Sequence, residues 1–239
     1  MTGSDPMKTI FTIHNVEYQG HYGTEVLNDI LGLPEDTYNT VEFEGDVNLM
    51  KGGIECANIV TTVSPSYAEE LKSPENAYGL HEIIIRNQHK LRGILNGIDT
   101  EKYDPENDKL IPAHYSADSL SGKGKDKEAL QKLAGLPVRD DVPLMAIISR
   151  LVDHKGTDLV MDSIDRLLDE DAQFIVLGTG YKKYEDFFKE LAYRRADKAA
   201  ALIQFNNELS HKVYAGADIL LMTISKTLMQ TGSAGTACP

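Results

Sequence analysis

The stretch VPLMAIISRLVDHKGTDLVMDSID, residues 142–165, decides the fold. An apolar run leads into a polar turn that holds Arg150 and Lys155, and apolar residues at helical spacing follow. The pattern predicts a buried strand over 144–148 and a helix over 157–168. Ligands of open α/β sheets bind at the carboxyl ends of strands, and a helix N-terminus beside two cations suits phosphate. Both cations are therefore candidate phosphate ligands, although their spacing fits solvated surface cations equally well.

The bulk composition is that of an ordinary soluble globular protein. The chain has 239 residues, 41% hydrophobic and 26% charged, which suffices for one large or two modest domains. A net charge of -13 argues against a general binder of nucleic acid or of anionic membranes. No apolar run has the length of a membrane span and the N-terminus has no signal-peptide pattern, so we expect a cytoplasmic protein. Cys56 and Cys238 lack zinc-site spacing, so no structural metal is expected.

Strand patterns in the first hundred residues end in polar residues that could contact a ligand. A strand is predicted over 8–14 and ends in His14 and Asn15. Further strands are predicted over 59–63 and 91–95, and the latter leads into Asn96. A histidine at this position is more often a satisfied structural residue. An asparagine in a turn of this composition favours a left-handed conformation.

The composition changes between residues 100 and 141, where proline, glycine, serine and charged residues dominate, and this indicates a passage between two domains. Strands and helices then alternate with short connections, which predicts a parallel, doubly wound sheet. Strands are expected over 144–148, 173–177, 201–205 and 218–222, and helices over 157–168, 184–194 and 209–214. The turn Gly178-Thr179-Gly180 fits either close approach of a phosphate or sugar to the backbone or simply a tight strand-to-helix connection.

Six stretches, in the same order and spacing, resemble bacterial glycogen synthases and plant starch synthases. They are TIHNVEYQG (12–20), ANIVTTVSPSYAEEL (57–71), GILNGIDTEKYDP (93–105), PLMAIISRLVDHKGTDL (143–159), VLGTG (176–180) and ELSHKVYAGADILLM (208–222). The resemblance implies an α/β fold of the GT-B type, in which two Rossmann-like, doubly wound domains face a cleft. It also implies transfer of glucose from ADP-glucose to the non-reducing end of an α-1,4-glucan with retention. Neither a metal nor another cofactor is then expected, and the partners are ADP-glucose and the glucan.

The resemblance also divides the chain. Residues 1–99 correspond to the end of the family's N-terminal domain, and 100–141 to the passage between domains. Residues 142–222 correspond to the first half of the nucleotide-sugar-binding domain, and 223–239 are expected to form a divergent, disordered tail.

Site residues carry over from the resemblance position by position. Arg150 and Lys155 match the basic pair that the family sets against the donor diphosphate, where charge develops as ADP leaves. His14 matches the histidine that contacts the donor glucose, with Asn15 beside it. Asn96 matches an asparagine near the reacting sugar.

Three more positions match the nucleotide side of the family's site. Phe205 stands where the family often has a tyrosine stacked on adenine. Gly178 and Gly180 match a glycine turn at the donor side.

Two departures from the family pattern qualify this prediction. The Lys-Thr-Gly-Gly-Leu loop that precedes the histidine strand in the family has no counterpart, and MTISKTLM (222–229) stands where the family has Glu-Pro-Cys-Gly-Leu. We therefore expect a chain truncated at both ends, marginal in stability and weakly active or inactive. The alternatives are a UDP-sugar-dependent GT-B transferase and a non-catalytic glucan- or nucleotide-binding remnant.

Overall fold

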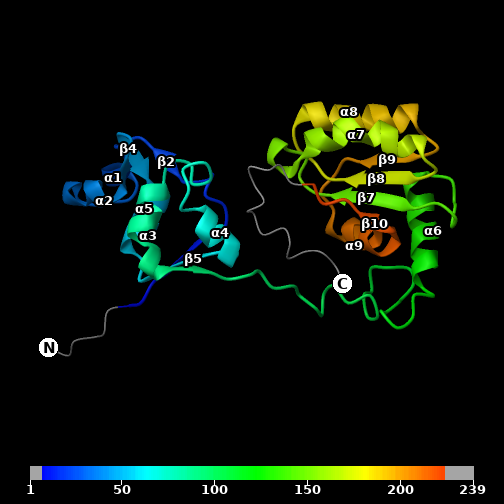
Figure 1. The fold of residues 1–239 in the computed structure, drawn as a ribbon, viewed down its shortest axis with the longest axis horizontal. Coiled ribbons are helices and arrows are strands. Elements are labelled where there is room, and N and C mark those ends of the chain that lie inside the picture. The colour runs from blue at the N-terminus through cyan, green and yellow to red at the C-terminus, as the bar shows by residue number, and fades with distance from the viewer. Residues whose placement is uncertain (1–6, 224–239) are drawn as a thin grey trace. The chain divides into compact units, whose positions relative to one another are not determined.

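Two parallel β-sheets, one in each of two units of the chain, form the framework of the computed structural model (Figure 1). The structure describes residues 7–223. The first unit ends at Gly97 and the second begins at Ile98. The α/β class predicted from the sequence is confirmed, since strands and helices alternate and both main sheets are parallel.

The sheet of the first unit has three parallel strands in the order β1-β5-β6. Their bounds are β1 (Ile10–Ile13), β5 (Ile59–Thr62) and β6 (Leu91–Gly93). Ile13 pairs with Thr62, and Thr62 pairs with Gly93, so the carboxyl ends of the three strands lie at one edge. Each predicted strand in this unit exists, with ends shifted by one or two residues.

Short helices and a second, small sheet complete the first unit. The helices are α1 (Val26–Asp29), α2 (Tyr38–Val41), α3 (Leu49–Cys56), α4 (Pro65–Glu70) and α5 (His81–Arg86), with 3-10 turns at Glu35–Thr37 and Gln88–Lys90. The small antiparallel sheet has the order β2-β4-β3, from β2 (His21–Tyr22), β3 (Glu42–Phe43) and β4 (Asp46–Asn48). Sequence periodicity did not indicate this sheet.

The two glycines of α3 allow neighbouring side chains to approach the helix closely. A Cβ on Gly53 would lie 2.5 Å from the ring of Phe11, and one on Gly52 would lie 2.8 Å from Val41. At the N-terminus the side chain of Asn48 accepts a hydrogen bond from the Lys51 N–H, which caps the helix. The cap and this packing support a helix that two glycines weaken by about 1 kcal/mol each.

The sheet of the second unit has four parallel strands in the order β10-β7-β8-β9. Their bounds are β7 (Leu144–Ile148), β8 (Gln173–Leu177), β9 (Ala199–Leu202) and β10 (Ile219–Leu220). The predicted bounds of β7 and β8 are confirmed residue for residue. The predicted strand over 201–205 is misplaced, because β9 begins two residues earlier and ends at Leu202.

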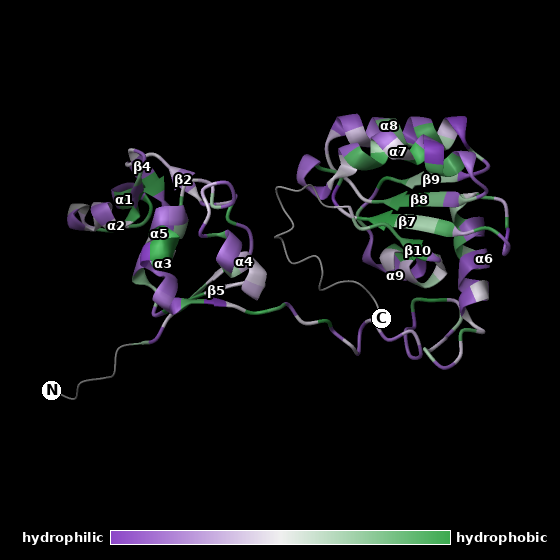
Figure 2. Ribbon diagram, viewed as in Figure 1, coloured by the Kyte–Doolittle hydropathy of each residue, from purple (hydrophilic) through white to green (hydrophobic). Residues whose placement is uncertain are grey.

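Helices cover both faces of this sheet, as predicted for a doubly wound arrangement (Figure 1). They are α6 (Lys123–Ala134), α7 (Thr157–Asp169), α8 (Lys182–Arg194) and α9 (Asn207–Gly216). Met145 and Ile147 of β7 pack with α7 and α8, while Leu144 and Ala146 pack with α6 and α9. Because side chains alternate along a strand, both faces of β7 are buried, and Figure 2 shows the central strands as hydrophobic.

The segment over 100–141 makes specific contacts within the second unit. Its helix α6 packs against α9. The contact is close, because a Cβ on Gly216 of α9 would lie 2.8 Å from the side chain of Leu130 in α6. Asp108 accepts a hydrogen bond from His211 of α9 at 2.6 Å, and both side chains are buried. These residues therefore form part of the second unit's packing.

Two further predictions concern membrane-spanning helices and the C-terminal tail. None of the helices described between residues 7 and 223 combines the length and apolar character that crossing a membrane requires. Of the predicted tail, Thr223 alone belongs to the described part, and the rest of 223–239 lies outside it.

Candidate functional site

The strand order of the second unit reverses at β7. From β7 the chain continues to β8 and β9 on one side, and it returns to β10 on the other side. This reversal is a topological switch point, and ligands of doubly wound sheets bind at the carboxyl ends of the strands there. Arg150 and Lys155 follow β7, and Thr223 follows β10, so all three lie at this place.

The turn after β7 is fixed by its own hydrogen bonds. A 3-10 turn, Asp153–Lys155, ends at Gly156, whose φ of 64° is left-handed, and α7 begins at the next residue. The hydroxyl of Thr157 donates to the carbonyl of Val152 at 3.0 Å. The basic turn is therefore anchored to the first turn of the helix, whose free N–H groups carry a partial positive charge.

Within the described part of the chain, the two cations of this turn have no acidic partner. Lys155 is half-buried, and among the described residues neither it nor exposed Arg150 takes part in an ion pair. Burial lowers the pKa of Lys155, and the positive charge of Arg150 lowers it further. An anion bound here would relieve both effects.

The acid of the same turn is engaged elsewhere. Asp153 accepts a hydrogen bond from Lys183 at 2.7 Å and another from the hydroxyl of Tyr184, both from α8. The Lys183 bond is the larger cause that lowers the pKa of Asp153, and the Tyr184 bond is the second. This carboxylate is thus paired with α8, and the positive charge of Arg150 and Lys155 is left for a ligand.

Gly178 and Gly180 are required by the packing of two turns. A Cβ on Gly178 would lie 1.9 Å from the carbonyl oxygen of Ser149, and one on Gly180 would lie 2.0 Å from that of Leu151. The Leu151 N–H donates to the Thr179 carbonyl at 2.9 Å, which joins the turns after β7 and β8. Of the two interpretations of this glycine turn, the tight connection now has a steric cause, and contact with a donor stays a prediction.

Phe205 lies past the end of β9 and is 94% exposed. It precedes Asn206, whose side chain accepts a hydrogen bond from the Leu209 N–H at 3.0 Å and caps α9. The ring therefore stands on a fixed helix start, and its faces are open to a planar ligand.

The first unit brings His14, Asn15 and Asn96 to one edge of its sheet. His14 and Asn15 directly follow β1, Asn96 follows β6 by three residues, and β5 runs between these strands. His14 and Asn96 are exposed, and their side chains have no hydrogen-bond partner within residues 7–223. The Asn15 side chain accepts from the Glu17 N–H at 2.9 Å, which shapes the turn.

One expectation about Asn96 is wrong. The described residues other than glycine that have positive φ are Glu44 and Tyr78, so Asn96 is not in the left-handed conformation that its turn composition favoured. Gly97, whose Cβ position faces open space, follows it.

Tyr67 stabilises the turn after His14 through a hydrogen bond, and sequence reasoning did not identify this residue. Its hydroxyl accepts a hydrogen bond from the Val16 N–H at 3.2 Å, and the side chain is fully buried. Burial raises the pKa of Tyr67, which keeps the hydroxyl neutral. The nearby Thr62 hydroxyl donates to the Ile13 carbonyl at 2.9 Å. No sequence pattern marks either residue, because each contact joins positions about fifty residues apart.

Between residues 7 and 223, no group of three or more His, Cys, Asp and Glu side chains is placed to hold a metal ion.

Comparisons with known proteins match both units. The model of the starch synthase catalytic domain matches residues 2–86. The chain is 45% identical over 218 residues to a glycogen synthase of Streptococcus mutans and 46% identical over 217 residues to one of Anaeromyxobacter, covering 90% of this chain in each case. The chain belongs to the glycogen and starch synthase family. The family recognised from the sequence is confirmed.

Solved structures agree with this assignment. The catalytic domain of starch synthase IV from Arabidopsis thaliana, bound to ADP and acarbose, superposes with a TM-score of 0.84 at 35% identity over 90% of this chain. Anabaena HepE, in complex with UDP and glucose, has a TM-score of 0.50 at 14% identity, which reflects the fold alone. The GT-B type of fold expected for the glycogen and starch synthase family is thereby confirmed. The chain spans about half the length of these relatives, 46% of each glycogen synthase and 45% of the starch synthase chain.

Proposed function

We propose that this chain forms the donor-binding part of a glycogen or starch synthase, and that the whole enzyme transfers glucose from ADP-glucose to the non-reducing end of an α-1,4-glucan with retention. The proposed location is the cytoplasm, or the plastid if the chain comes from a plant. The observation that carries the proposal is a pair of cations, Arg150 and Lys155, at the switch point of a doubly wound sheet, with no acidic partner among residues 7–223. A relative that binds ADP and acarbose supports the choice of ligand.

The proposed role of the cations is to hold the diphosphate of the donor. Negative charge develops on ADP as the bond to glucose breaks, and positive groups fixed in advance stabilise that charge without rearranging. Arg150 would bind phosphate oxygens through its planar guanidinium, and half-buried Lys155 would act as a point charge. The N-terminus of α7 adds partial positive charge on the same side.

The remaining site residues would bind the two ends of the donor. The exposed ring of Phe205 would stack on adenine, and Gly178 and Gly180 would let the ligand approach the backbone. In the first unit, we propose a separate sugar-contacting role for His14 and Asn96, whose side chains have no hydrogen-bond partner within residues 7–223, with Asn15 beside them.

Calorimetric titration of ADP into the purified chain tests the proposal. We expect Arg150→Ala to weaken binding by about tenfold or more, the loss typical of a charge-assisted phosphate contact. Arg166→Ala is the matched control, because Arg166 is also exposed and lies in the last turn of α7. Equal affinities of the Arg150 variant and the parent chain would contradict the proposal, and tighter binding of UDP than of ADP would favour a UDP-sugar enzyme.

Incorporation of labelled glucose into glycogen tests transfer. We expect little or none from this chain alone, because it spans about half the length of its relatives. Binding of ADP without transfer would fit the donor-binding role, and absence of both would contradict that role and exclude a nucleotide-binding remnant.

A further inference from the structure

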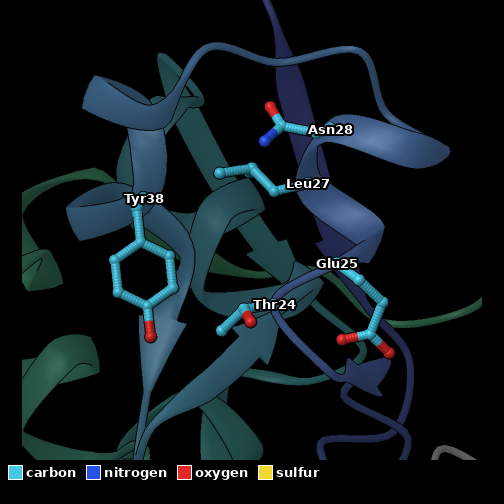
Figure 3. A pocket seen from close by; sticks show the side chains of 5 residues that line it. All are labelled: Thr24, Glu25, Leu27, Asn28 and Tyr38. Atoms are coloured by element: carbon cyan, nitrogen blue, oxygen red, sulfur yellow. The ribbon is translucent and has the colours of Figure 1, made fainter.

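The first unit contains a pocket that shares no residue with the candidate site. It has a volume of about 590 Å³, within the range of roughly 300–1,000 Å³ that small-ligand pockets occupy. Thr24, Glu25, Leu27 and Asn28, in and just before α1, line it together with Tyr38 at the start of α2. Figure 3 shows the ring of Tyr38 on one side, with Leu27 and Thr24 extending toward it.

The apolar part of this pocket is fixed. Leu27 is buried and packs with Val41 and Val47, and the ring of Tyr38 packs against the same cluster. The Tyr38 hydroxyl donates a hydrogen bond of 3.1 Å to the carbonyl of Gly45, which holds the far end of the ring. The pocket therefore offers a preformed aromatic and aliphatic wall.

Apart from Tyr38, the polar side chains of the pocket make no hydrogen bonds to other described residues. The side chains of Thr24, Glu25 and Asn28 are exposed, and none has a hydrogen-bond partner among the residues that the structure describes. Glu25 is the charged residue of the lining, and no lysine or arginine lines the pocket. A phosphate or nucleotide would meet a negative charge here, so the lining disfavours anions.

We propose that this pocket binds a glucosyl unit of a neutral α-glucan, as a second carbohydrate site apart from the donor site. A sugar ring has apolar C–H faces and a polar rim of hydroxyls. The faces suit Tyr38 and Leu27, while the hydroxyls can donate to the Glu25 carboxylate and both donate to and accept from Asn28. The choice of an α-glucan rests on the proposed function, whereas the choice of a neutral polyol rests on the lining itself.

Titration of maltoheptaose into the isotope-labelled chain, followed by NMR, tests the proposal. We expect saturable shifts of the Leu27 methyl groups and of the Thr24 and Asn28 amides. Glu25→Ala and Asn28→Ala should each weaken this binding about fivefold, the loss of roughly one hydrogen bond. Both positions are exposed, so neither variant should unfold the unit. Glu75→Ala, an exposed carboxylate of the same unit outside the pocket, should leave the affinity unchanged.

The outcomes separate this proposal from the donor site. The proposal would be overturned if maltoheptaose caused no shifts at Leu27, or if it caused shifts only near His14. It would also be overturned if the Glu25 and Asn28 variants bound maltoheptaose as tightly as the parent chain does. The titration is repeated with Arg150→Ala, which should weaken ADP binding by about tenfold or more and leave the Leu27 shifts intact. If the parent chain does not bind ADP, the proposed function is contradicted. The maltoheptaose titration would still decide independently whether the pocket binds a glucan.

Discussion

The hydroxyl of Thr223 donates a hydrogen bond of 2.8 Å to the carbonyl oxygen of Lys155, which joins the ends of β10 and β7 at the switch point. The bond holds the basic turn from the side opposite to β8. Lys155 is the half-buried cation of that turn, so its position depends on a residue 68 positions further along the chain.

Replacing Thr223 by valine should loosen the basic turn. The variant removes the hydroxyl and keeps the shape, so we expect a loss of about 1 kcal/mol in the free energy of unfolding, typical of one hydrogen bond, and weaker ADP binding. Urea unfolding and calorimetry measure the two effects. Thr223→Ser, which retains the hydroxyl, should behave as the parent chain does, and a Ser variant as weak as the Val variant would argue against the hydrogen bond as the cause.

The protonation of Lys155 should respond to both Arg150 and ADP. Its pKa is lowered by burial and by Arg150, so Arg150→Ala should raise it, and bound ADP should raise it further by supplying negative charge. NMR titration of the Lys155 side chain measures each shift. A pKa that does not change on adding ADP would show that the diphosphate binds elsewhere.

The same shift predicts how stability depends on pH. The unfolded chain has the ordinary lysine pKa of 10.5, and the folded chain has a lower one, so the unfolded state binds more protons between the two values. Stability contributed by this group therefore rises as the pH increases through that window. Lys155→Met should remove this contribution, which unfolding curves at several alkaline pH values would reveal by difference.

Gly178→Ala should destabilise the second unit severely. The new methyl group would lie 1.9 Å from the backbone carbonyl oxygen of Ser149, which cannot move without breaking the turn, so a loss of about 2–4 kcal/mol is expected. Gly124→Ala in α6 is the control, because its Cβ would face open space. That variant should gain about 0.5–1 kcal/mol. Equal stabilities of the two variants in urea would refute the steric argument.

Tyr67→Phe should weaken the turn that carries His14. It leaves the buried Val16 N–H without its acceptor, at a cost of about 1–3 kcal/mol in the free energy of unfolding. Tyr193→Phe removes a hydroxyl from a side chain that is 87% exposed and should change stability little. Amide exchange of Val16 provides a direct measurement, and unchanged protection there would contradict the assigned role.

Sequence reasoning located the elements best where the hydrophobic pattern was uninterrupted. β7 and β8 are buried on both faces, so their apolar runs coincide with the strands. The end of β9 was misplaced, because apolar residues continue to Phe205 after the pairing with β8 has stopped. The strands of the small sheet have two or three residues each, which is too short for any period to appear.

The location of the basic turn was predictable from the sequence, but the contacts that support it were not. Strand, basic turn and helix can be read locally, and this order placed Arg150 and Lys155 correctly at the end of β7. The contacts of Tyr67 and Thr223 join distant positions and depend on how the chain folds back. The pocket beside Tyr38 likewise depends on how α1 and α2 come together, which no local pattern shows.

The steric demand at Gly178 and Gly180 bears on how sequence variation at these positions should be interpreted. Any side chain would collide with the backbone of the neighbouring turn whether or not a nucleotide sugar is present. Selection would therefore retain both glycines even in a descendant that had lost catalysis. Their invariance in an alignment would record the joining of two turns, whereas retention of Arg150, an exposed side chain without an ion pair among the described residues, would be a better marker of surviving activity.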